Sequence, residues 1–143
     1  MIFKYQKQTD QYTTYTIITS EDSGCTELAT INGVTYVHVP DDITLPDQPE
    51  QITVEAVTLT PELREEIKAV SPAVRLSYKR LQERIRSRYS IEDEQYLTRI
   101  TVGFLSGTYD MQEDEPGLIT AYQAWVEDCR EIARLERTAI GLA

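Results

Sequence analysis

The sequence predicts an α+β fold, in which a small antiparallel N-terminal β module with a hairpin precedes a three- to four-helix C-terminal part. Three observations predict it. β-branched and aromatic residues dominate the first strands, an Asn-Gly turn joins two of them, and later apolar residues recur at α-helical spacing. We expect residues 1–59 to form the β-rich module and residues 60–143 the helical module of this 143-residue chain.

The β module begins with two predicted strands, at residues 2–7 and 12–19, because both segments favour a pleated surface. A hairpin follows, in which residues 25–31 and 34–39 flank Asn32-Gly33. Asn and Gly tolerate the positive φ of a type I′ turn. Because side chains alternate along a strand, His38 lies on one face with Val34 and Tyr36. Without a nameable partner, His38 is expected to be a half-exposed structural residue.

Residues 40–51 contain three prolines and four acidic residues, so we expect an extended linker there, or a segment that lies over a surface. Residues 52–59 are interpreted as a further strand or an extended arm.

The helical part starts at Thr60-Pro61, where threonine caps and proline fits the first helical position. Ser71-Pro72 repeats this start signal, which predicts a short helix, a kink and a longer helix to about Ser87. The apolar positions continue across the kink at a helical period: Leu63, Ile67, Val70, Val74, Tyr78, Leu81 and Ile85.

A third helix is predicted over residues 91–106, capped by Ser90 and ended by Gly107. Its second half is apolar nearly all round, so we expect it to be the central, largely buried helix. The last helix opens at Pro116 or Gly117 and runs to about Ile140. Its predicted apolar stripe is Leu118, Tyr122, Trp125, Cys129 and Ile132, with Val126 and Ala133 beside it.

The net charge and the residue types of the chain disfavour several functions. The net charge is -10 and the pI about 4.5, so nucleic acid and anionic membrane surfaces repel the chain on average. Its residues include no glycine-rich phosphate loop, metal-ligand spacing or nucleophile-base pattern. We therefore expect no enzyme activity, no cofactor and no metal. The acidic residues at 110–115 lack the spacing of a calcium loop, and we interpret them as a solvated loop that favours the next helix.

The stretch from Arg75 to Arg88 is the only basic patch, with six basic residues and one acidic residue. On a helical wheel, Arg75, Lys79 and Arg86 lie on one side of the apolar stripe, and Arg80, Arg84 and Arg88 lie on the other. Intramolecular packing, with arginine stems covering the seam, and recognition of a partner helix both fit this pattern. Tyr122 and Trp125 are core residues or interface anchors. The partner-binding candidates are Arg75, Lys79, Arg80, Arg84, Arg86, Tyr122 and Trp125.

The helical part also resembles a known family. The segments IRSRYSIEDEQYLTRI and YQAWVEDCREIARLERTAIGL, with the linker PDDITLPDQPEQI, are similar to the C-terminal region of small tail-fibre assembly proteins of tailed bacteriophages. The resemblance covers roughly the last 85 residues. It implies a chaperone-type tail accessory protein that helps a fibre chain to fold, trimerise or attach, by protein-protein contact and without catalytic residues.

Alternatives stay open at this point. The chain is also consistent with a permanent structural subunit of the phage baseplate or tail, or with a small regulatory nucleic-acid-binding module that uses the basic stretch. The expected partner is a tail fibre or baseplate protein, and self-association into a homo-oligomer is left open. No signal peptide or membrane-spanning run is visible. We expect the protein in the host cytoplasm during assembly, and retention in the virion tail remains an alternative.

Overall fold

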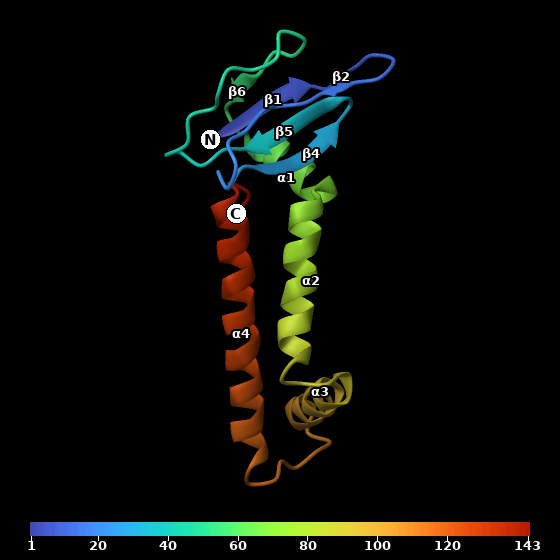
Figure 1. Ribbon diagram of the computed structural model, residues 1–143. Helices are drawn as coiled ribbons and strands as arrows, with labels where there is room; N and C mark the ends of the chain where they lie inside the picture. Colours follow the sequence, from blue (N-terminus) through green and yellow to red (C-terminus); the bar gives the residue numbers. More distant parts are fainter. The chain divides into compact units, whose positions relative to one another are not determined.

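The computed structural model describes residues 1–143 and confirms the α+β class. Six strands precede four helices along the chain (Figure 1). The strands are β1 Ile2–Gln6, β2 Gln8–Thr9, β3 Thr14–Tyr15, β4 Thr26–Ile31, β5 Val34–His38 and β6 Glu55–Val57. The helices are α1 Pro61–Val70, α2 Pro72–Arg86, α3 Ile91–Leu105 and α4 Glu115–Ala139.

The main sheet is antiparallel and has the strand order β4-β5-β1-β6, while β2 and β3 form a separate pair. The predicted hairpin is confirmed, because β4 pairs with β5 and the turn residues have positive φ, 50° at Asn32 and 79° at Gly33. A bulge interrupts the β4–β5 register between Glu27 and Ala29. The change from strands to helices falls between β6 and α1.

The prediction of a strand over residues 12–19 is wrong except at Thr14–Tyr15. The physical reason lies in the linker, because the side-chain amide of Gln48 forms hydrogen bonds with the backbone N–H and carbonyl of Ile18. Gln48 Oε1 accepts from the Ile18 N–H at 2.7 Å, and Gln48 Nε2 donates to the Ile18 carbonyl at 2.8 Å. One side chain thus takes the place of a neighbouring strand.

The chain divides into two compact units. The first comprises residues 1–77 and 135–143, and both faces of its sheet are covered. One face packs Ile2 and Leu28 against Ile67 of α1, Val74 of α2 and Leu142, the residue before the last of the chain. On the other face, Tyr5 and Val37 pack with Val39, Ile52 and further apolar residues, among them two of the linker, Ile43 and Leu45. The linker forms no helix or strand over 40–51, as predicted.

The second unit, residues 78–134, contains the C-terminal part of α2, all of α3 and most of α4. The break between α1 and α2 at Ser71 and the caps at Thr60 and Ser90 are confirmed. The predicted apolar stripes are only partly buried. In α4, Cys129 and Ala133 are buried, whereas Leu118 and Ile132 are exposed. None of the helices combines the length and apolarity that a membrane span requires.

The expectation that α3 is a central, largely buried helix is wrong. Only Leu97 and Ile100 are buried, whereas Val102, Phe104 and Leu105 are 59%, 55% and 78% exposed. The physical reason is that α3 buries a single face within its unit. A helix with apolar side chains on all of its faces is fully buried only when other elements pack against every face. In this unit, other elements pack against one face of α3.

Candidate interaction surface

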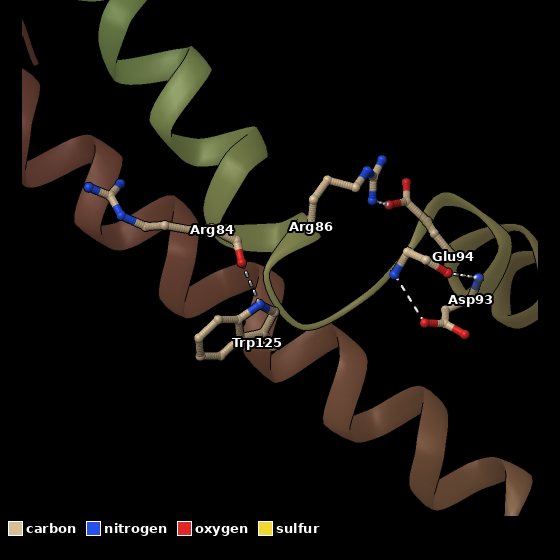
Figure 2. Close-up of polar contacts among 6 residues, drawn as sticks. Arg84, Arg86, Asp93, Glu94 and Trp125 are labelled. Carbon is tan, nitrogen blue, oxygen red and sulfur yellow. Dashed lines mark hydrogen bonds and ion pairs between the residues drawn. The ribbon is translucent and has the colours of Figure 1, made fainter.

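The corner between α2 and α3 fixes the direction of α3 (Figure 2). Ser90 Oγ accepts from the Asp93 N–H, and the Asp93 carboxylate accepts from the Ser90 N–H, both at 3.0 Å. This capping box satisfies two backbone donors at the helix start. On the same turn, Glu94 forms an ion pair with Arg86 at the end of α2, and both side chains are about one-third exposed.

Trp125 of α4 joins this corner. Its Nε1 donates to the Arg84 carbonyl at 3.3 Å, as Figure 2 shows. The Arg88 guanidinium lies 5.0 Å from the Trp125 ring centroid, and Tyr89 makes an edge-to-face contact with Tyr122 at 5.0 Å. The aromatic side chains of α4 therefore contact both the end of α2 and the short connection to α3 within the second unit.

The partner-binding candidates thus have different environments. Arg75, Lys79 and Arg80 are exposed on α2, and Lys79 forms only a long ion pair with Glu83, at 3.9 Å. Arg86, Tyr122 and Trp125 are half-buried in the contacts described above. Arg84 is half-buried too, and its backbone carbonyl carries the contact with Trp125. The structure brings this second group together, and it leaves the first at the surface.

A carboxylate of the acidic segment 110–115 holds the other end of α3. Glu115, the first residue of α4, is 1% exposed. It accepts hydrogen bonds from the phenols of Tyr96 and Tyr109 and, at 2.7 Å, from the Gln112 N–H. The interpretation of residues 110–115 as a solvated loop is therefore wrong for Glu115. The sequence signal for a buried carboxylate at this position was weak, because the two phenols that donate to Glu115 lie 19 and 6 residues away in the chain.

These hydrogen bonds favour the charged carboxylate. The bond from Tyr96 is the largest cause that lowers the pKa of Glu115, and the bonds from Gln112 and Tyr109 add to it. The same contact raises the pKa of Tyr96 to about 12, because a phenolate cannot donate a hydrogen bond to Glu115 and would face its negative charge. The cluster needs no ligand to be satisfied, so we interpret it as structural.

Between the capping-box corner at its start and the Glu115 cluster at its end, α3 exposes one face to solvent. A hollow of about 560 Å³ follows its outer face, lined by Arg86, Ile91, Glu94, Gln95, Thr98, Arg99 and Val102. A smaller hollow, of about 160 Å³, lies between α3 and α4 and shares Thr98 and Val102 with the first. The end of α3 adds the exposed Phe104 and Leu105. These features form an apolar surface on a fixed helix, which is a suitable shape for protein contact.

Comparisons with models of protein families, with curated proteins and with solved structures gave no significant match. No group of three or more His, Cys, Asp or Glu side chains is arranged to hold a metal ion.

Proposed function

We propose that this chain is a phage tail accessory protein that binds a tail-fibre chain and assists its folding, trimerisation or attachment. The action is by protein-protein contact and involves no bond-making chemistry. The resemblance of the helical part to tail-fibre assembly proteins motivates the assignment.

The exposure of Phe104 and Leu105 is the observation that carries the proposal. Burial of an aromatic or leucine side chain stabilises a protein by about 1.5–3 kcal/mol. Two such side chains, adjacent and more than half exposed at the end of α3, leave about half or more of that stabilisation available to a partner. Aromatic residues on such patches are frequent anchors of interfaces. Fibre chains expose apolar surface before they trimerise, which gives these anchors a suitable target.

Co-expression with the tail-fibre chain of the same phage tests the proposal. We expect the wild-type protein to raise the yield of soluble fibre trimer and to co-purify with the fibre chain. The variant Phe104→Ser/Leu105→Ser should lose both effects. Ile18→Ser, which removes an apolar side chain that is 46% exposed in the other unit, serves as the matched control and should keep both.

Unchanged fibre solubility and trimer yield, together with failure to co-purify, would refute the accessory role. Stoichiometric presence in purified particles without any effect on fibre yield would instead favour a permanent structural subunit of the tail or baseplate.

A further inference from the structure

The outer face of α3 carries a second pattern, which ends before Phe104 and Leu105. Ile91, Gln95, Thr98 and Val102 follow one another at steps of four, three and four residues, and all four are exposed. We call this set the outer stripe. Its steps are those of the a and d positions of a coiled coil, which face a second helix. Ile91 and Val102, the apolar ends of the stripe, are 55% and 59% exposed.

Two charged residues flank the stripe on one side. Glu92 and Arg99 are seven residues apart, so they lie above one another on the helix surface. Both are exposed, and neither forms an ion pair within the chain. The opposite flank carries Glu94, whose carboxylate is already paired with Arg86 (Figure 2).

We propose that two copies of this chain associate through their α3 helices, packed antiparallel along the outer stripe. In the register that we infer, Ile91 packs against Val102 of the second copy, and Gln95 lies opposite Thr98 of the second copy. The two-fold symmetry of such a dimer makes each contact occur twice. The amide of Gln95 and the hydroxyl of Thr98 form a polar centre, which favours one register over its neighbours.

Charge complementarity supports this orientation. In the proposed register, Glu92 of each copy lies next to Arg99 of the other, so two new ion pairs form. A parallel pair would instead place Arg99 beside Glu94 of the second copy, and that carboxylate already has a partner. An antiparallel register shifted by one heptad would place the two Arg99 side chains together.

The proposed interface between the two α3 helices is small, and its area limits the affinity of the dimer. Two paired helices of this length bury less than the roughly 1,200 Å² that is typical of stable interfaces. We therefore expect a reversible dimer with a Kd of about 10 µM or weaker, and not an obligate one. This association does not depend on the tail-fibre assignment, because its residues differ from Phe104 and Leu105.

Sedimentation velocity over about 1 µM to 1 mM protein tests the dimer. We expect a concentration-dependent shift from monomer to dimer in the wild type. Arg99→Glu and Glu92→Arg should each weaken it at least about fivefold, since each replaces two attractive pairs by two repulsive ones. The double variant Glu92→Arg/Arg99→Glu should restore it, which a general loss of folding would not do.

The same charge change elsewhere is the control. Arg80→Glu, at an exposed position on α2, should leave the association unchanged. Val102→Asp should weaken it at least about tenfold while circular dichroism shows the wild-type helix content. A monomer at every concentration would overturn the proposal, as would a dimer that is insensitive to Val102→Asp and to both single charge changes.

Mixed disulfides test the orientation, in a Cys25→Ser background because Cys25 is only half-buried. An equimolar mixture of Ile91→Cys and Val102→Cys proteins should form a cross-linked dimer under mild oxidation. Either protein alone should not, because its two introduced thiols lie far apart in the antiparallel pair. Rapid cross-linking of Ile91→Cys with itself would overturn the antiparallel arrangement.

Discussion

The phenol of Tyr109 donates a hydrogen bond to Oε1 of Glu115, and the two oxygen atoms lie 2.7 Å apart. Tyr109 belongs to the loop after α3, and Glu115 begins α4, so this bond closes the connection between the two helices. Tyr96, from the middle of α3, donates to the same carboxylate. With the Gln112 N–H, three donors converge on one buried acceptor, which fixes the end of α3 that carries the proposed contact residues.

The first prediction concerns Glu115 and acid. Its folded-state pKa is lowered from the ordinary 4.5, so it stabilises the fold above that value, and this stabilisation is lost as pH falls through the folded-state pKa. At pH 7 we expect Glu115→Gln to unfold at a lower urea concentration than the wild type. The gap between the two should narrow as the pH is lowered below about 4.

Urea unfolding at a series of pH values measures this gap. Glu113→Gln changes an exposed carboxylate of the same loop and is the matched control, for which we expect a much smaller change at pH 7. A gap between wild type and Glu115→Gln that stays constant from neutral to acid pH would contradict the prediction.

The second prediction concerns Tyr96 at high pH. Because its folded-state pKa is raised to about 12, it stabilises the fold up to pH 10, and this stabilisation is lost as pH rises from 10 towards 12. In a spectrophotometric titration of the folded protein, Tyr96→Phe should remove an ionisation near pH 12. Tyr12→Phe, at a side chain that is 88% exposed, should leave that ionisation in place. An unchanged high-pH step in Tyr96→Phe would show that Tyr96 does not bond to Glu115.

The turns and helix caps of this fold were predictable, because each depends only on residues that are close together in the sequence. The Asn32-Gly33 turn needs only two residues that tolerate positive φ, and Thr60 and Ser90 cap helices whose N–H donors lie three residues away. These signals lie within one short window of sequence, so no knowledge of the rest of the chain is required.

Burial depends on distant partners, and it was not predictable in the same way. The residues ITVGFL predicted a central helix, but nothing in them says that only one face of α3 would be covered. The buried carboxylate of Glu115 depends on Tyr96, which lies 19 residues earlier in the chain and outside the acidic loop. The spacing of the outer stripe is visible in the sequence. The same spacing also occurs in stripes that are buried in a core, so only the exposure of Ile91 and Val102 distinguishes the two.

The third prediction separates two helix starts that look alike in sequence. Thr60 Oγ1 accepts from the Leu63 N–H at 3.2 Å, so Thr60→Ala should lower the free energy of unfolding by about 1 kcal/mol. Ser71 is 0% exposed, and its Oγ has no hydrogen-bond partner. Ser71→Ala should therefore raise that free energy by about 1 kcal/mol, because a buried hydroxyl without a partner is removed. Chemical denaturation measures both values. A loss in Ser71→Ala equal to that in Thr60→Ala would mean that Ser71 caps α2 after all.

The last prediction uses two helical glycines with opposite surroundings. A Cβ at Gly103 of α3 would lie 2.7 Å from Cβ of Tyr109, whose phenol is bonded to Glu115 and cannot easily retreat. Gly103→Ala should therefore lower the free energy of unfolding by about 1–3 kcal/mol, although alanine favours helices. A Cβ at Gly117 of α4 meets nothing within 4 Å, so Gly117→Ala should raise it by up to about 1 kcal/mol. Thermal unfolding of both variants decides the matter, and stabilisation by Gly103→Ala would show that the loop after α3 does not pack against that helix.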